Sequence, residues 1–316
     1  MKHISILFLL HIALVNYSQT RKVFFSSPSD TYIISSDLHI HTVFSDGEVW
    51  PSIRIKEARR DSLDLISMTE HLEYLPYKND IIITDRNRSF NISKALLIKD
   101  ELLMIVNGSE ITKPMPPGHF NAIFVKDVNP LLNSNGEKSM IEANKQGAFV
   151  FWNHPNWVEN RDDGIARLDK MHERLLEKKQ HRPVTFILSK NRTIKSIRDA
   201  LFNQKTFVWH RDMLIGKEEN ISPVVSENLK ISSLGYYKKI VTIKIRNESV
   251  VPFKLKYLGD YTFHSYSSIL EIPARGELLV TIKTKEILSS IDMSFEVLNV
   301  ITAPNKNLII KKNISL

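Results

Sequence analysis

The feature that most restricts the fold of this chain is a strand-like run that leads directly into two closely spaced histidines. Residues 32–34 are apolar and mostly β-branched, which is typical of a buried strand. His39 and His41 follow, two residues apart, so in an extended strand they would point to the same side. Asp46 precedes the turn-forming Gly47, and its carboxylate can return toward the two rings. This stretch predicts half of a divalent-metal site at the end of a strand.

The next part of the chain repeats this arrangement. Between residues 21 and 217, short apolar runs alternate with helix-like segments, which is typical of βαβ units and a mostly parallel sheet or barrel. A histidine or carboxylate is expected just after the apolar run of each of the first five strands, and in barrels such side chains gather at the C-terminal ends of the strands. The expected strands are Ile33–His41, Leu63–Glu70, Leu102–Glu110, Asn121–Val125, Ala148–His154, Val184–Leu188 and Phe207–Trp209. The expected helices are Pro51–Ser62, Ser93–Glu101 (with Asn91 or Ser93 as its cap), Ser139–Gln146, Arg161–Lys179 and Thr193–Asn203.

The polar residues at these strand ends have the chemistry of a transition-metal site. Histidine together with carboxylate suits Zn²⁺, Mn²⁺ or Fe²⁺, whereas Ca²⁺ and Mg²⁺ prefer oxygen ligands alone. A carboxylate such as Glu110 can bridge two ions, and neutral imidazoles can serve as terminal ligands. We interpret Glu70 and Glu73 as partners that orient histidines. The groups that recur are His39, His41, Asp46, His71, Glu110, His119 and His154.

Five short motifs, in order, resemble the polymerase-and-histidinol-phosphatase (PHP) family of metal-dependent phosphoesterases. The resemblance covers Ser35 to about Lys217, with Glu70 where the family usually has Asp. The motifs are Asp37-Leu38-His39-Ile40-His41 with Ser45-Asp46-Gly47, Thr69-Glu70-His71, Gly108-Ser109-Glu110, Gly118-His119-Phe120 and Asn153-His154-Pro155.

The resemblance implies an α/β fold, a distorted (βα)₇ barrel, and an exported phosphodiesterase-like protein. It implies two or three divalent ions, and hydrolysis of a small anionic phosphate monoester or diester by a metal-bound hydroxide. Glu110, Asp46 and His154 are the residues expected to act in catalysis. The metal ligands that the resemblance implies are His39, His41, Asp46, His71, Glu110, His119 and His154.

The chain departs from the family pattern where the site should close. The family ends its site with an Asp-x-His pair on a late strand, and no Asp-x-His occurs after His154. The segment ending at Lys179 runs directly into His181, as if about one and a half βα units were deleted, so we expect an incomplete barrel. His181, or His210 with Asp212, are candidate substitutes for the missing pair. Two alternatives stay open: a degenerate barrel that binds metal or a phosphorylated ligand without turnover, and loss of a segment that the natural protein retains.

The two ends of the chain predict export and a second domain. Residues 1–19 resemble a signal peptide, because their apolar run is too short to span a membrane; a retained anchor is the alternative. We therefore expect a periplasmic or secreted protein without a membrane anchor, a barrel over 20–221 and a β-sandwich over 222–316. The sandwich strands are expected at Leu229–Ser232, Ile240–Ile245, Phe253–Leu258, Ile269–Ile272, Leu278–Ile282, Met293–Val297 and Leu308–Ile310.

Composition narrows the partners of the chain. The net charge is +8, but the Lys and Arg residues are scattered along the sequence and not gathered in a stripe. We therefore expect no nucleic-acid binding, although a positive field would help to attract an anionic substrate. The chain has no cysteine, which excludes disulfides and lipoprotein attachment.

Overall fold

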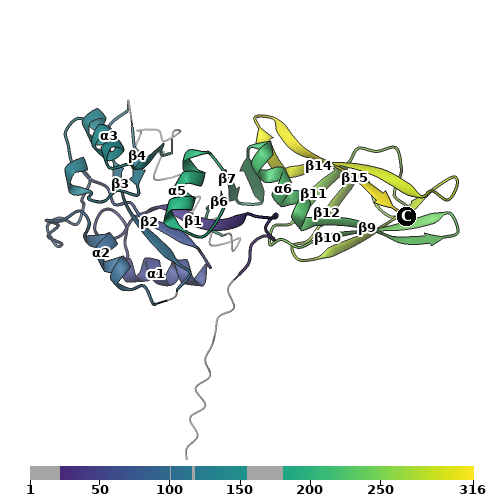
Figure 1. Cartoon of the computed structure of the whole chain (residues 1–316), viewed down its shortest axis with the longest axis horizontal. Helices are drawn as coiled ribbons and strands as arrows, with labels where there is room; N and C mark the ends of the chain where they lie inside the picture. The colour runs from purple at the N-terminus through teal and green to yellow at the C-terminus, as the bar shows by residue number, and fades with distance from the viewer. Residues whose placement is uncertain (1–21, 100, 116–117, 155–180) are drawn as a thin grey trace, which may run out of the picture.

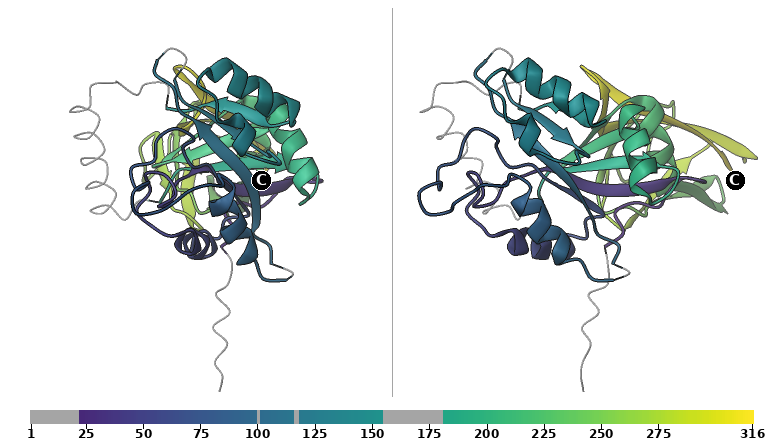
Figure 2. Two further views of the ribbon diagram at one scale, coloured as in Figure 1. Left: turned by 90° about the vertical axis from the view of Figure 1, so that its left-hand side faces the viewer. Right: turned by 60° about the vertical axis from the view of Figure 1, so that its left-hand side comes forward.

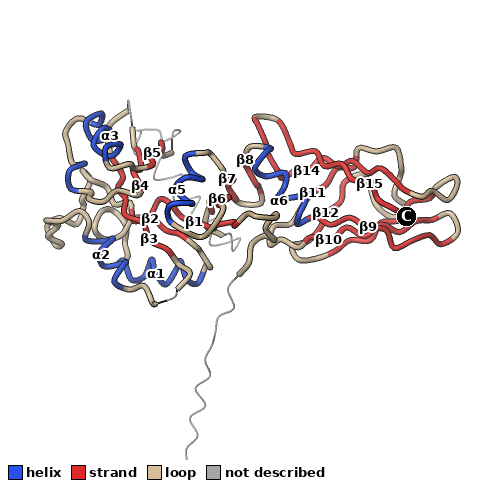
Figure 3. The backbone as a smooth tube through the Cα atoms, in the orientation of Figure 1, coloured by secondary structure: helices blue, strands red, loops and turns tan. Residues whose placement is uncertain are grey.

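A long mixed β-sheet runs through this computed structural model, which describes residues 22–99, 101–115, 118–154 and 181–316. The predicted signal peptide at 1–19 and the predicted helix Arg161–Lys179 lie outside these residues. Within them, no helix is both long enough and apolar enough to cross a membrane. Figures 1 and 3 show the sheet passing from an α/β half of the molecule into an all-β half.

The α/β half is built around three parallel strands. β1 (Tyr32–Ile40), β2 (Leu65–Met68) and β3 (Met104–Ile111) lie side by side, as their buried apolar runs predict. β4 (Phe120–Ile123) pairs antiparallel with β3, and β5 (Phe149–Trp152) pairs antiparallel with β4. Parallel pairing therefore stops at β3, so the expectation of a mostly parallel sheet holds only for this central part.

Helices cover one face of these strands and follow their local sequence signals. α1 (Pro51–Arg60) begins with a proline, whose missing N–H costs nothing in the first turn. α3 (Gly136–Lys145), which follows the short 3₁₀ helix η1 (Asn129–Leu131), is capped by Asn135, whose side chain accepts from the Lys138 N–H. α2 spans Arg88–Ala95, so the predicted helix Ser93–Glu101 was wrong in register.

The misplaced register of α2 has a physical cause. Ser93, expected as a cap, is fully buried inside the helix. The residue that precedes the helix is Asn87, whose amide donates to Asp127 and whose Oδ1 accepts from Asn107. These bonds join segments about 20 and 40 residues away. Tertiary hydrogen bonding therefore places the start of α2.

On the other side of β1 the sheet is antiparallel. β6 (Val184–Ser189) pairs with β1, and β7 (Thr206–His210) pairs with β6. β8 (Met213–Gly216) forms a hairpin with β7, and α6 (Glu218–Asn228) follows; both were missed, because Phe207–Trp209 was predicted to be the last strand of this domain. β8 then pairs in parallel with β14 of the second domain.

The predicted (βα)₇ barrel is not confirmed. In the described residues the sheet has the order β12-β11-β14-β8-β7-β6-β1-β2-β3-β4-β5, so β5 lies at one end and does not close onto β6. β5 is four places from β1, yet Phe149 and Phe151 pack against the core cluster that contains Ile34 and Leu38 of β1. The sheet therefore curls toward itself without closing, as the side view in Figure 2 illustrates.

Helix α5 (Ile194–Phe202) lies against the concave side of this curl. The helix was predicted at Thr193–Asn203, and Thr193 caps it by accepting from the Ser196 N–H. α5 contacts both β6 and β5, the two strands that do not pair. Arg198 Nε donates to the Gly147 carbonyl at 2.9 Å, and the Phe202 and Phe149 rings are 5.2 Å apart. α5 thus bridges strands that the sheet leaves apart.

The C-terminal domain contains two sheets, and a strand lies at each of the seven predicted positions. β9 (Leu229–Tyr237), β10 (Ile240–Asn247) and β13 (Glu277–Lys283) form one antiparallel sheet. The other continues the long sheet, and its buried side chains share one core with those of β10 and β13. The predicted domain boundary between 221 and 222 falls inside α6. The strands of the second sheet are β11 (Phe253–Tyr257), β12 (Ile269–Ile272), β14 (Ser290–Ala303) and β15 (Lys306–Ser315).

Candidate metal centre

One edge of the curled sheet collects all seven predicted ligand residues. His41, His71 and Glu110 stand at or just beyond the C-terminal ends of the parallel strands β1, β2 and β3. His119 precedes β4, which corrects the expectation that such residues follow their strands; because β4 is antiparallel to β3, its N-terminal end lies at the same edge. β5 reverses direction again and brings His154 there.

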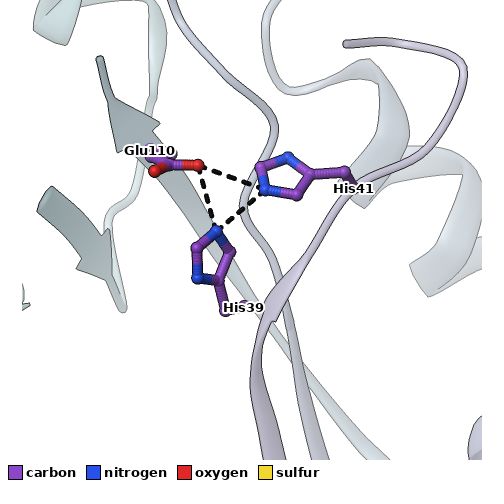
Figure 4. Close-up of side chains that lie close together, drawn as sticks. All are labelled: His39, His41 and Glu110. Carbon is purple, nitrogen blue, oxygen red and sulfur yellow. Dashed lines mark hydrogen bonds and ion pairs between the residues drawn. The ribbon is translucent and has the colours of Figure 1, made fainter. Parts of the chain in front are cut away.

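Glu110 is the centre of this cluster and is fully buried. Figure 4 shows the rings of His39 and His41 directed at its carboxylate. Oε2 lies 3.0 Å from His39 Nε2 and 3.1 Å from His41 Nε2, and those two nitrogens are 2.8 Å apart. Oε1 lies 2.9 Å from His119 Nδ1 and 3.3 Å from His154 Nε2. His71 Nδ1 also lies 3.3 Å from Oε2. The two oxygens of one carboxylate therefore face two different sets of histidines.

A second group of possible ligands lies beside the first. Asp46 Oδ2 is 3.3 Å from His71 Nε2, and Asp46 Oδ1 is 3.6 Å from His41 Nδ1. The candidate ligand atoms of His41, Asp46 and His71 lie within 4.8 Å of one another. The same holds for His39 with His41 and Glu110, and for His71 with Glu110 and His119. These overlapping groups share side chains, as ligands of neighbouring ions do.

The loop after β1 is shaped by close backbone contact. β1 ends at Ile40, and its pairing with β2 shifts register between Asp37 and Ile40. The alternation of side chains along a regular strand therefore does not by itself determine the direction of the His41 side chain. The Gly47 N–H donates to the Thr42 carbonyl at 3.0 Å. A Cβ on Gly47 would lie 2.5 Å from the His41 carbonyl oxygen, so only glycine fits there. The tight loop brings Asp46 back to the histidines.

Buried Glu70 holds that loop in place. Its carboxylate accepts hydrogen bonds from the Thr42 N–H at 3.0 Å, the Thr42 hydroxyl at 2.6 Å and the Ser45 hydroxyl at 2.5 Å. Ser45 Oγ in turn lies 3.3 Å from His41 Nδ1. The expectation that Glu70 orients a histidine thus has a structural path through Ser45, a residue whose role the sequence did not indicate.

Two more polar residues support the cluster and were also missed. Thr112 Oγ1 is 2.6 Å from His71 Nδ1, and the Thr112 N–H donates to Glu73 at 2.9 Å, so Glu73 acts on His71 through Thr112. The Asn153 amide donates to Glu110 Oε1 at 3.0 Å and to Asn121 at 2.8 Å. The position of Asn153 beside His154 was the available sequence signal.

The crowding of side chains around Glu110 is explained better by bound cations than by hydrogen bonds alone. A carboxylate offers about four acceptor positions, yet five imidazoles and one amide approach Glu110 within 3.3 Å. Burial by itself would raise the pKa of Glu110, but hydrogen bonds with four of the imidazoles outweigh burial and hold this pKa far below its usual range. The pKa of Asp46 is also lowered, because contacts with His71 and His41 outweigh its burial. Both carboxylates are therefore ionised, as metal ligands must be.

Comparison with known proteins agrees with this arrangement. A crystal structure from Bacteroides vulgatus ATCC 8482, of a two-domain protein containing a predicted PHP-like metal-dependent phosphoesterase, is 33% identical to this chain. The match covers 95% of this chain and 100% of that chain, with a TM-score of 0.81. This chain belongs to the PHP-like metal-dependent phosphoesterase family. A family model of an Ig-like domain matches residues 229–313, and no protein with a curated description matches the chain.

The PHP-like domain does not recruit the suggested substitutes for the absent Asp-x-His pair. The His181 ring stacks on Trp209 with centroids 3.4 Å apart, and its nitrogens contact the carbonyls of Arg182 and Arg211. His210 is the last residue of β7, and Asp212 lies exposed in the turn between β7 and β8. Among the described residues, neither His181 nor this pair belongs to a group of possible metal ligands.

Arg182 has a different role in the PHP-like domain. Its guanidinium bonds Asp37 Oδ2 at 2.7 Å and Asp61 Oδ2 at 3.0 Å, and it approaches Glu57 at 3.5 Å. Asp37 Oδ1 accepts from the His39 N–H at 3.3 Å. Arg182 therefore ties β6 to α1 and to the first residue of the metal-binding motif.

Proposed function

We propose that this chain hydrolyses phosphate esters at a divalent-metal centre. The observation that carries the proposal is the convergence of seven potential ligands on one sheet edge, with ionised Glu110 among five histidines. Membership of the PHP-like family supports the same reaction class. Mixed nitrogen and oxygen ligands favour Zn²⁺, Mn²⁺ or Fe²⁺.

The grouping of side chains suggests two or three ions. Glu110 would help to hold more than one ion, because its two oxygens face different imidazoles: Oε2 faces His39, His41 and His71, and Oε1 faces His119 and His154. Asp46 and His71 would complete a further position together with His41. When bound, divalent ions lower the pKa of water and neutralise phosphate charge.

The protein's own residues position the substrate, supply negative charge and control which side chains the substrate reaches. Glu110 is buried, whereas 39% of the Asp46 side chain and 34% of the His154 side chain are exposed, so a substrate meets these two residues first. Asp46 is ionised and can accept a proton from a nucleophilic water. His154 has a backbone φ of +23°, a strained value for a non-glycine residue, and its ring stacks on His39 with centroids 5.8 Å apart. His154 therefore stands at the open rim of the centre, where it would contact the substrate as well as a bound ion.

A paired measurement of metal content and turnover tests this function. The purified chain should contain two or three equivalents of Zn, Mn or Fe and hydrolyse 4-nitrophenyl phosphate or its bis-ester in a metal-dependent way. Glu110→Gln and His119→Ala should lose both properties. His264→Ala, at an exposed histidine of the Ig-like domain, is the matched control. A protein without bound metal and without metal-dependent hydrolysis would refute the proposal.

The second candidate is a domain that binds metal or a phosphorylated ligand without turnover. The absence of Asp-x-His after His154 in the sequence favours it, as does the separate placement of His181. The metal content distinguishes the two: about one tightly bound ion with no hydrolysis supports a binding protein, and two or three ions with hydrolysis support the enzyme.

We also propose that the protein acts outside the cytoplasm, on a small anionic phosphoester. Fractionation of cells that express the full chain should place it in the periplasm or the medium, with a mature N-terminus near Gln19. A full-length protein in the membrane fraction would instead support a retained anchor.

A further inference from the structure

A pocket of about 340 Å³ adjoins the proposed metal centre on the concave side of the curled sheet. Its lining comes from β1, β5, β6 and the segment from the end of α5 to the start of β7. It thus lies where β5 and β6 fail to pair. His39 belongs to both places: it lines the pocket, and its Nε2 lies 3.0 Å from Glu110. A molecule in the pocket would therefore extend from the metal centre.

The walls of the pocket are mainly aromatic and aliphatic. Phe149 and Phe151 of β5 stand on one side, and Leu38 and Leu201 belong to the core cluster against which they pack. Aromatic and aliphatic walls with a few polar groups are typical of small-molecule sites. Such walls favour a flat, uncharged group that stacks on or packs against the rings.

The floor of the pocket carries small neutral polar side chains. Ser36 of β1 faces Thr185 of β6 in the sheet register, and Thr206 of β7 faces Ile187, which belongs to the core cluster on the same side. Elsewhere this side of the sheet carries Ile34 and other apolar residues. Short side chains at these positions leave the space open. The Ser36 hydroxyl is buried and donates to the Thr185 carbonyl at 2.7 Å, so the hydroxyls of Thr185 and Thr206 are the ones that can interact with an oxygen-bearing ligand.

Charge excludes the phosphate group itself as the occupant. Among the described lining residues there is no lysine or arginine. The one lining carboxylate, Asp37, is paired with Arg182 at 2.7 Å. A phosphate group would find its positive partners at the metal centre and not here.

We propose that this pocket binds the uncharged organic part of the phosphoester, an aromatic or similarly flat group, while its phosphate lies at the metal centre. The inference rests on the proposed function and adds a substrate class to it. A dry cavity of about 150 Å³ holds one benzene ring. By proportion, 340 Å³ accommodates roughly a dozen non-hydrogen atoms, which is the size of a naphthyl group.

Filling the pocket tests the inference without relying on turnover. Thr206→Phe should fill the space, and aromatic residues are well accepted in strands. Thr206→Val, which keeps the volume, is the matched control. In ligand-observed NMR with the protein as purified, 2-naphthol should bind to wild type and Thr206→Val alike and at least tenfold more weakly to Thr206→Phe. No binding to wild type at millimolar 2-naphthol, or equal binding to Thr206→Phe, overturns the inference.

Kinetics with two substrates give an independent readout. Thr206→Phe should raise KM for 2-naphthyl phosphate at least tenfold and leave KM for methyl phosphate within twofold. If Thr206→Phe does not fold, Phe151→Ala replaces it, with Phe90→Ala as control, because Phe90 lies on α2 and packs against a different core cluster. An active enzyme that does not bind 2-naphthol overturns only this inference, whereas an inactive protein that binds it overturns only the proposed function.

Discussion

Glu70→Gln is the sharpest test of how the loop after β1 holds the metal centre. The Glu70 carboxylate is 6% exposed and accepts three hydrogen bonds from Thr42 and Ser45. Oε2 accepts two of them and Oε1 accepts the third. A glutamine placed with its carbonyl at the Oε2 position keeps two bonds, but its NH₂ then faces the Thr42 hydroxyl. The substitution therefore weakens the anchor of the loop that carries Asp46 and contacts His41.

The size of the effect follows from the hydrogen bonds that are lost. A hydrogen bond to a charged group contributes about 1.5–3 kcal/mol. Glu70→Gln removes the charge from all three bonds and reverses the donor in the one with the Thr42 hydroxyl, so we expect the free energy of unfolding to fall by about 2 kcal/mol. Glu70→Ala loses all three bonds and leaves a cavity, for a loss of about 4 kcal/mol. Loss of a residue that orients ligands typically weakens metal binding by about 10–100-fold.

Urea unfolding and calorimetric metal titration measure the two effects separately. Glu101→Gln is the matched control, because Glu101 is a partly buried glutamate that pairs with Arg59 at 2.6 Å. It precedes β3 and so stands at the opposite end of the strand from Glu110. This control should lower stability by about 1 kcal/mol and leave metal affinity unchanged. Wild-type metal affinity in Glu70→Gln would refute the reasoning.

Three further predictions concern the same framework. Gly47→Ala should abolish metal binding, because its Cβ would meet the His41 carbonyl oxygen at 2.5 Å. The control Gly235→Ala, at φ +91° with open space around it, should lower the free energy of unfolding by about 1 kcal/mol and leave metal content intact. Equal metal content in both variants would contradict the steric argument. Arg182→Met should lower the free energy of unfolding by about 3 kcal/mol, since Asp37 loses its guanidinium partner and Asp61 and Glu57 keep only Arg60 and Arg54. Arg246→Met at the exposed Glu248 pair should stay within about 0.5 kcal/mol, and similar urea midpoints for the two variants would be evidence against this network. The hydrogen bond with Arg59 lowers the pKa of Glu101. The stabilisation from this bond is therefore present above the usual glutamate pKa of about 4.3 and is lost as pH falls below it. The difference in free energy of unfolding between wild type and Glu101→Gln should shrink on acidification, and a constant difference from pH 7 to 3 would contradict this assignment.

The candidate site could be predicted from the sequence to an unusual extent because its residues stand beside short, recognisable strands. His39, His71 and Glu110 each lie at or next to the end of a buried apolar run, and parallel strands place such ends at one edge. The strands of the second domain were also readable, because β-branched and aromatic runs separated by turn residues are local signals. The supporting residues Ser45, Thr112 and Asn153 were not, since their roles depend on contacts across strands.

The sequence by itself determined which side chains can bind metal, the family that the chain resembles, and the order of most strands and helices. Tertiary structure alone decided that the sheet curls without closing, that β8 joins it to the second domain, and that α5 bridges β5 and β6. The physical reason is that hydrophobic period, caps and turns are properties of neighbouring residues, whereas strand partners are chosen by hydrogen bonds and packing between distant ones. No pattern within Val184–Ser189 or Met213–Gly216 specifies that one strand pairs with β1 and the other with β14.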